Sequence, residues 1–231
     1  MSNKNISFIS SFSPKGFVEY GKKFIESFDS DNINLFIGVE DDPSNYPKKK
    51  NIFYFRLSLD IQVFLQSELN NFPDSVKNDY RFQASKFCQK VLAINNDILP
   101  KEGYRIWIDA DVLFLKKMTQ QNMLAIVEGF DITYLGRSSW HHSESGFVAF
   151  FLNDNGKSFI RRWLWYFDSG RVFSLAEWHD AYVFDVVRRE FNGLTENNLS
   201  KGVHGLNVWP STELSKYMTH FKGNSKNNLS T

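Results

Sequence analysis

The chain has 231 residues, 42% of them hydrophobic and 16% aromatic, which supplies a full core and excludes an intrinsically disordered protein. Its 27 lysines and arginines against 26 aspartates and glutamates give a net charge of +1. That balance argues against nucleic acid as a partner, because proteins held by phosphate contacts carry a marked basic excess. The single cysteine, Cys88, excludes an internal disulfide and a cysteine zinc cluster.

The N-terminal apolar stretch is short and is interrupted by serines, so no signal peptide is predicted. No uncharged run approaches the ~20 residues that span a bilayer. We therefore expect a soluble, cytoplasmic protein without a transmembrane segment.

Predicted strands and helices alternate along the chain. Strands are expected at 6–10, 34–39 and 52–57, with a helix after Ser13-Pro14 and further helices at 60–69 and about 80–94. The apolar run 104–115 reads as one strand buried on both faces. Strands at 132–135 and 146–152 and helices at 156–167 and 179–191 complete the pattern. This order favours an α/β fold with a mainly parallel central sheet flanked by helices, in which ligands bind at the carboxyl ends of strands.

Two carboxylates, Asp109 and Asp111, interrupt the most apolar predicted strand. Ionised carboxylates in such surroundings are costly unless a positive charge meets them. Mg²⁺ and Mn²⁺ prefer oxygen ligands and often share a shell with phosphate oxygens. An acidic turn is the plainer alternative, but the apolar run resumes after Asp111, which favours a metal site.

A second motif, HxxGxxK, lies near the end of the printed sequence and consists of His220, Gly223 and Lys226. The imidazole can complete a metal shell, glycine allows the backbone to approach a phosphate, and lysine neutralises diphosphate charge. A chance pattern in a polar tail is the alternative.

A hydrophobic strand that ends in DxD, with HxxGxxK far downstream, resembles the GT-A fold glycosyltransferases that use nucleotide sugars. The pattern is most similar to the retaining family of glycogenin and bacterial lipopolysaccharide galactosyltransferases, with its small bacterial and viral relatives. The resemblance implies one domain over residues 1–231, with a nucleotide-binding part at about 1–115, a sugar and acceptor part at about 116–223, and a flexible tail at 224–231. Asn227-Asn228 stand where that family has Pro-Trp.

The resemblance also implies roles for individual residues. Asp109, Asp111 and His220 would hold Mn²⁺ (or Mg²⁺), and the metal would hold the diphosphate of a donor, expected to be a UDP-sugar. The nucleotide or diphosphate would contact Ser10, Arg81, Ala110, Gly223 and Lys226. The donor sugar or an acceptor glycan or glycoconjugate would contact Lys86, Glu144, Ser145, Gly146, Trp178 and His179.

Several of these residues have ordinary structural explanations as well. Glu144 is equally well explained as a solvated loop acid, and Arg81 and Lys86 as members of a solvated helix face. Asp180 is expected near the start of a helix, where the helix dipole stabilises a carboxylate. It would be the base of an inverting enzyme, or would orient the sugar in a retaining one, and the resemblance favours retention.

Other functions fit the sequence less well. A haloacid-dehalogenase-like phosphatase also has DxD after an apolar strand, but normally close to its N-terminus. A nucleotidyltransferase usually begins with a glycine-rich loop, which Ser10–Ser13 is not. A non-catalytic carbohydrate-binding protein would use aromatic residues and would not need the acid pair.

Overall fold

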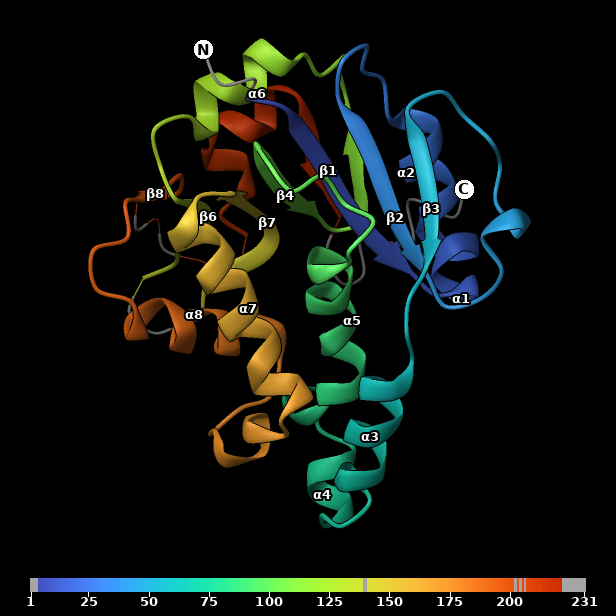
Figure 1. The fold of residues 1–231 in the computed structure, drawn as a ribbon, viewed down its shortest axis with the longest axis vertical. Helices are drawn as coiled ribbons and strands as arrows, with labels where there is room; N and C mark the ends of the chain where they lie inside the picture. The colour runs from blue at the N-terminus through green and yellow to red at the C-terminus, as the bar shows by residue number, and fades with distance from the viewer. Residues whose placement is uncertain (1–3, 139–140, 202, 204, 206, 222–231) are drawn as a thin grey trace.

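The structure, a computed structural model, describes residues 4–138, 141–201, 203, 205 and 207–221 (Figure 1). Within these residues a seven-stranded sheet has the order β3-β2-β1-β4-β7-β6-β8. Neighbouring strands from β3 to β4 are parallel, β7 is antiparallel to both β4 and β6, and β8 is parallel to β6. The predicted α/β class with a mainly parallel sheet is therefore confirmed. The strands are β1 (Ile6–Phe12), β2 (Asn34–Val39), β3 (Ile52–Arg56), β4 (Tyr104–Ile108), β6 (Ile132–Leu135), β7 (Glu144–Phe151) and β8 (Glu196–Asn198).

The prediction of a single strand over 104–115 is wrong. The chain turns at 109–111 after β4, and the second apolar run forms β5 (Val112–Phe114). β5 leaves the large sheet and pairs antiparallel with β9 (Met218–His220). Both runs are mostly buried, so hydrophobicity alone could not reveal that they belong to different sheets.

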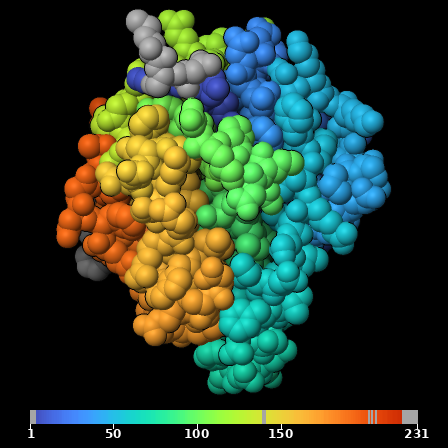
Figure 2. Space-filling view, viewed as in Figure 1, coloured from blue at the N-terminus to red at the C-terminus, as the bar shows by residue number. Residues whose placement is uncertain are grey.

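Helices cover the two faces of the sheet because alternate side chains of each strand point to opposite sides. On β4, Ile106 and Ile108 pack in the core beneath α2 and α6, whereas Trp107 packs in the core beneath α3, α5, α7 and α8 (Figure 1). Figure 2 views the second face, where the segments around α3, α4 and α7 gather at the lower end. The bounds are α2 (Lys22–Ser27), α3 (Asp60–Leu69), α4 (Asp74–Lys77), α5 (Ala84–Asn95), α6 (Gln120–Val127), α7 (Asp154–Asp168) and α8 (Asp180–Glu190).

The first helical segment has a local start signal and an irregular middle. Ser13 Oγ accepts a hydrogen bond of 3.1 Å from Gly16 N, and Pro14 occupies the first helical position of α1 (Pro14–Gly16). A π-helical turn (Phe17–Gly21) follows and leads into α2. Short 3₁₀ turns lie at Pro43–Asn45, Tyr80–Phe82, Arg171–Ser174, Trp209–Ser211 and Glu213–Lys216. Across the described residues, every helix is too short or too polar to cross a membrane.

Candidate functional site

The turn that carries Asp109 and Asp111 lies at the carboxyl end of β4, in the middle of the large sheet. Asp109 N donates to Gly146 O at 3.0 Å, and Asp109 O accepts from Val112 N at 3.2 Å. These two bonds close the turn and tie it to β7. Asp111 is 6% exposed, whereas the side chain of Asp109 is 28% exposed.

His220 meets this turn because β9 pairs with β5. Val112 lies opposite His220 in the register, and Phe221 N donates to Asp111 O at 3.0 Å. His220 Nε2 lies 2.9 Å from Asp111 Oδ1 and 3.9 Å from Asp109 Oδ2. We call Asp109, Asp111 and His220 the aspartate–histidine cluster. Each residue offers one ligand atom, and these atoms lie within 4.8 Å of one another.

The donor set of this cluster suits a hard divalent cation. Two carboxylates and one imidazole are ligands that Mn²⁺ accepts, and the two negative charges would be balanced by its charge. His220 Nδ1 is buried without a hydrogen-bond partner among the described residues, so the ring is held mainly by packing and by Asp111. The centroids of the Trp209 and His220 rings are 5.2 Å apart.

Gly146 provides the room in which His220 packs. A Cβ atom at residue 146 would lie 2.7 Å from His220 Cε1, which is closer than packed atoms tolerate, and 3.1 Å from Nδ1, which is a tight contact. Oε1 of the neighbouring Glu144 accepts a hydrogen bond of 3.2 Å from Gly146 N and lies 3.9 Å from His220 Nδ1. The Glu144 carboxylate also forms an ion pair with Arg137. The predicted sugar-contact segment 144–146 therefore lies against the aspartate–histidine cluster.

Lys90, which the sequence analysis did not single out, is buried and links the cluster to α8. Its Nζ lies 3.1 Å from Asp109 Oδ1, donates to Ser145 O at 2.8 Å and forms an ion pair with Asp180. Asp180 Oδ2 also accepts from Ser145 Oγ at 2.8 Å. The sequence carried no clear signal for this role, because Lys90 follows Gln89 on a predicted helix, where a lysine usually has a solvated head.

Charge pairing at Lys90 outweighs burial. Burial alone would lower the pKa of Lys90, but Asp109 and Asp180 beside it hold that pKa above its usual value. Burial alone would raise the pKa of Asp180, but Lys90, His179 and Ser145 hold it below its usual value. Asp180 is therefore ionised at neutral pH, as its place in the first turn of α8 predicted.

The negative charges of the same two acids also affect Tyr20, which lies in the π-helical turn. Burial, together with the negative charges of Asp111 and Asp109, raises the pKa of Tyr20 to about 12. The phenol is thus a neutral neighbour of the cluster at physiological pH. π-Helical turns occur frequently at functional sites. The residue types at 17–21 do not reveal the π-helical turn, so the sequence did not point to Tyr20.

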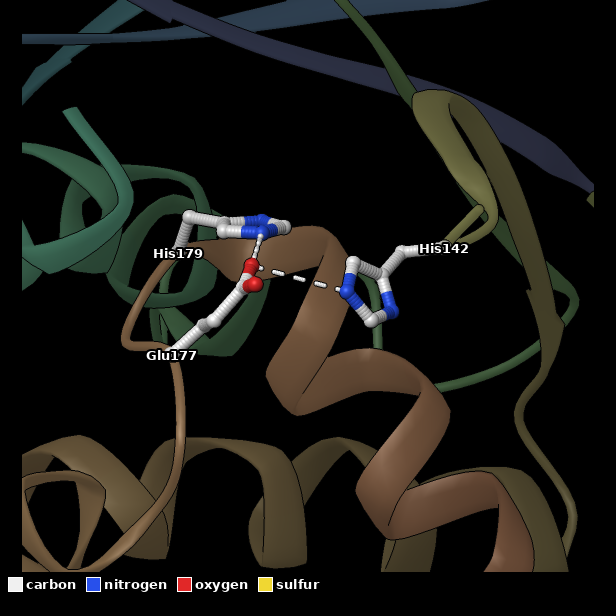
Figure 3. Close-up of side chains that lie close together, drawn as sticks. All are labelled: His142, Glu177 and His179. Carbon is white, nitrogen blue, oxygen red and sulfur yellow. Dashed lines mark hydrogen bonds and ion pairs between the residues drawn. The ribbon is translucent and has the colours of Figure 1, made fainter. Parts of the chain in front are cut away.

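A second group of potential ligands lies across a pocket of about 410 Å³. Figure 3 shows Glu177 between His142, which precedes β7, and His179, which precedes α8. Glu177 Oε2 lies 2.8 Å from His179 Nε2 and 3.5 Å from His142 Nε2. We call these three residues the histidine–glutamate cluster. Their pocket is also lined by Glu144 and Ser145, so it reaches the residues beside the aspartate–histidine cluster.

A larger hollow of about 760 Å³ shares no lining residue with either cluster. It lies over α2 and the turn after β2, where Phe17, Tyr46 and Lys49 contribute to its wall. Volume alone therefore does not mark the site, and the grouping of ionisable side chains is the better guide.

The remaining predicted nucleotide and sugar residues are scattered. Ala110 lies between the two acids and is buried, and Ser10 is fully buried in β1 with no hydrogen-bond partner for its hydroxyl among the described residues. Arg81 lines the 410 Å³ pocket and pairs with Asp79 at 2.6 Å. Lys86 is exposed, with its Nζ 5.9 Å from the centroid of the Phe87 ring, and it is Lys90, one helical turn later, that reaches the acids.

The expectation that Trp178 contacts the donor sugar or acceptor, as part of a sugar-binding wall, needs correction. Trp178 is 4% exposed, and its ring packs edge-on against Phe72, Phe82 and Phe173 with centroids 4.8–4.9 Å away. Its indole N–H donates to Leu175 O at 3.1 Å. Trp178 belongs to the core, and its neighbour His179 faces the pocket instead.

The predicted diphosphate residues Gly223 and Lys226, and the tail 224–231, lie outside the described residues. Of the HxxGxxK motif, the structure therefore places His220 alone. No model of a known protein family matches this chain, and neither does any curated protein with which it was compared.

Proposed function

We propose that the chain is a metal-dependent glycosyltransferase of the GT-A type. It would move a sugar from a nucleotide-diphosphate donor, a UDP-sugar, to a hydroxyl of a glycan or glycoconjugate. The observation that carries the proposal is the meeting of His220 with Asp109 and Asp111, across more than a hundred residues of sequence. The three residues come from the motifs on which the resemblance rests, and their ligand atoms form one group.

Asp109, Asp111 and His220 would hold Mn²⁺ or Mg²⁺. When bound, the cation supplies positive charge that stabilises the departing diphosphate without a proton transfer. Lys90 Nζ and Trp107 Nε1 both contact Asp109 Oδ1, at 3.1 Å and 2.6 Å, and together they orient the carboxylate. Oδ2, which faces His220, remains the oxygen offered to the cation.

We assign Asp180 a positioning role, which favours the retaining stereochemistry. A general base must accept a proton readily at neutral pH. Burial tends to raise the pKa of Asp180, but Lys90 outweighs it and lowers that pKa. The carboxylate already pairs with Lys90 and accepts a hydrogen bond from Ser145 Oγ, so it is poorly suited to accept a proton. Asp180 would hold Lys90 and Ser145 in place beside the donor. In a retaining transferase the departing phosphate oxygen can take the acceptor's proton instead.

Residues 1–231 would form one transferase domain, with the nucleotide-binding part at about 1–115 and the sugar and acceptor part at about 116–223. Asp109 and Lys90 come from the first part, and Ser145, Asp180 and His220 come from the second. Donor and acceptor would meet where these residues converge, at the 410 Å³ pocket that Glu144 and Ser145 line.

The test is release of nucleoside diphosphate from a panel of nucleotide sugars, with Mn²⁺ and then with EDTA. We expect slow, Mn²⁺-dependent hydrolysis of one donor, and its loss in Asp111→Asn. Asp97→Asn is the matched control, because Asp97 is a fully exposed acid on the surface. Cleavage of simple phosphate esters would indicate a phosphatase instead. Sugar binding without any donor hydrolysis would indicate a carbohydrate-binding protein, and undiminished metal-dependent UDP binding by Asp111→Asn would refute the metal assignment.

A further inference from the structure

We propose that His142, Glu177 and His179 form a second metal site, which takes Zn²⁺ and leaves one coordination position open to the 410 Å³ pocket. Nothing in the sugar-transfer proposal requires these three residues as metal ligands. The inference stands whether or not the chain transfers sugars, because it rests on the grouping of the side chains themselves.

The distances suit zinc. Zinc takes four ligands in tetrahedral geometry, with bonds of about 2.0–2.1 Å to histidine nitrogen and carboxylate oxygen, so ligand atoms sit about 3.3 Å from each other. Glu177 Oε2 lies 2.8 Å from His179 Nε2 and 3.5 Å from His142 Nε2, and all three ligand atoms lie within 4.8 Å of one another. Small side-chain adjustments would bring them around one ion.

The kind of ligand distinguishes this cluster from the first. Two imidazoles and one carboxylate are a set that zinc uses in sites with an open position, whereas the two carboxylates of the aspartate–histidine cluster favour a harder cation. Arg81 Nη1 lies 4.0 Å from Glu177 Oε1. The other carboxylate oxygen, Oε2, faces both histidines (Figure 3).

Packing holds both imidazoles beside Glu177. The centroids of the His142 and His179 rings are 5.3 Å apart, and Tyr182 packs edge-on against His142 at 4.8 Å. Phe87 packs edge-on against His179 at 5.9 Å. His179 is 9% exposed, while His142 is half-buried at the pocket, so an ion would have a route in and restricted room once bound.

One hydrogen bond opposes the site, and it is weak in comparison. His179 Nδ1 accepts from Tyr182 N at 3.2 Å and thereby caps α8. In that tautomer Nε2 carries the proton and donates to Glu177. Zinc on Nε2 would place the proton on Nδ1 and end the capping bond. Losing one helix cap is a small cost, so binding of Zn²⁺ by two imidazoles and a carboxylate can offset it.

The experiment measures Zn²⁺ stoichiometry and affinity by competition with a chromophoric chelator, using the full chain. We expect two zinc ions per wild-type chain, because the aspartate–histidine cluster also accepts Zn²⁺, and one ion in His142→Ala, Glu177→Gln and His179→Asn. Each of these variants should weaken the second site by more than about 100-fold. Asparagine at residue 179 keeps a helix cap while removing the imidazole. His141→Ala, an exposed histidine of the same pocket, is the matched control and should keep two ions.

Asp111→Asn should leave the second site intact and bind one ion, and Asp111→Asn with His142→Ala should bind none tightly. Melting in EDTA checks that each variant is folded before zinc is added. Equal zinc stoichiometry and affinity in the wild type and in His142→Ala and His179→Asn would overturn the proposal, as would loss of the second ion in His141→Ala.

Discussion

Replacing Lys90 with methionine tests the central link of the site. Methionine keeps most of the aliphatic length of lysine but removes the ammonium that contacts Asp109, Asp180 and Ser145 O. Two carboxylates then lose their buried counter-charge. The side chain of Asp109 is 28% exposed and still accepts a hydrogen bond from Trp107 Nε1, so solvent and the indole partly stabilise its charge. Asp180 is 4% exposed and retains the hydrogen bond from Ser145 Oγ.

The size of the effect follows from leaving Asp180 charged and buried. Removing one partner of a buried ion pair costs about 3–5 kcal/mol. In a domain of this length a loss of 1 kcal/mol lowers the melting temperature by roughly 2–4 °C, so Lys90→Met should melt roughly 6–20 °C below the wild type. In Lys90→Met with Asp180→Asn the unpaired charge is gone, and a double-mutant cycle should give a coupling energy of about 2 kcal/mol.

The pH dependence gives a second readout of the same variant. In the wild type the pKa of Asp180 is below its usual value, so its contribution is present above about pH 4 and is lost as pH falls through the folded-state pKa. The pKa of Lys90 is above its usual value, so its contribution is present below about pH 10 and is lost as pH rises further. Between about pH 5 and 9 the wild-type pair therefore adds a constant amount.

Without Lys90, burial should raise the pKa of Asp180 above its unfolded value. The folded state then takes up a proton more readily than the unfolded state, and Lys90→Met should become more stable as pH falls from about 8 to 5. The assay is thermal and urea unfolding in EDTA, so that no bound cation neutralises Asp109. A melting temperature within about 2 °C of the wild type, or a pH profile parallel to it, would refute the account of Lys90 as the buried counter-charge.

Three further predictions concern other parts of the site. Gly146→Ala should displace His220, because a Cβ would lie 2.7 Å from its Cε1; we expect about 1–3 kcal/mol of lost stability in urea unfolding and weaker Mn²⁺ binding, and unchanged Mn²⁺ affinity would contradict this packing role. Trp178→Ala should cost about 3–5 kcal/mol as a core truncation while UDP affinity per folded molecule stays unchanged, so a selective loss of sugar-donor binding in a stable variant would restore the sugar-wall interpretation. Truncation after Phe221 removes Gly223 and Lys226 and should abolish donor hydrolysis with little change in melting temperature; an active truncated protein would make the end of the HxxGxxK pattern a coincidence.

The regular elements were predictable where periodicity and end signals agreed. The strand over Asn34–Val39 and the helix over Asp60–Leu69 have the predicted bounds. The helix over Gln120–Val127, capped by Thr119, was missed. The polar strand Glu196–Asn198 was missed as well; it pairs with β6 and has no hydrophobic alternation. Such a strand exists because its backbone completes a sheet edge, and backbone pairing leaves little trace in the residue types.

Residues of the site were predictable when their chemistry was out of place in the sequence. Asp109 and Asp111 stand out because they interrupt an apolar run, and the structure indeed brings them to His220. Lys90 did not stand out, because a lysine on a helix usually has a solvated head. Trp178 misled for the opposite reason, since an aromatic residue between two ionisable ones suggests a binding surface although this ring fills the core.

The β5–β9 pair explains why the cluster depends on two distant stretches of sequence. β5 follows the acid turn at once, so its direction is set by the end of β4, and β9 supplies His220 opposite Val112. Trp209 N–H donates to Met218 O at 3.0 Å and its ring packs on Phe147 of β7, which anchors β9 to the core beneath the large sheet. Core packing and backbone pairing therefore place β9, and the contact of His220 with Asp111 completes the placement of the ring. A cation held there would bridge the turn after β4 and the strand β9, so metal binding and the docking of β9 should stabilise each other.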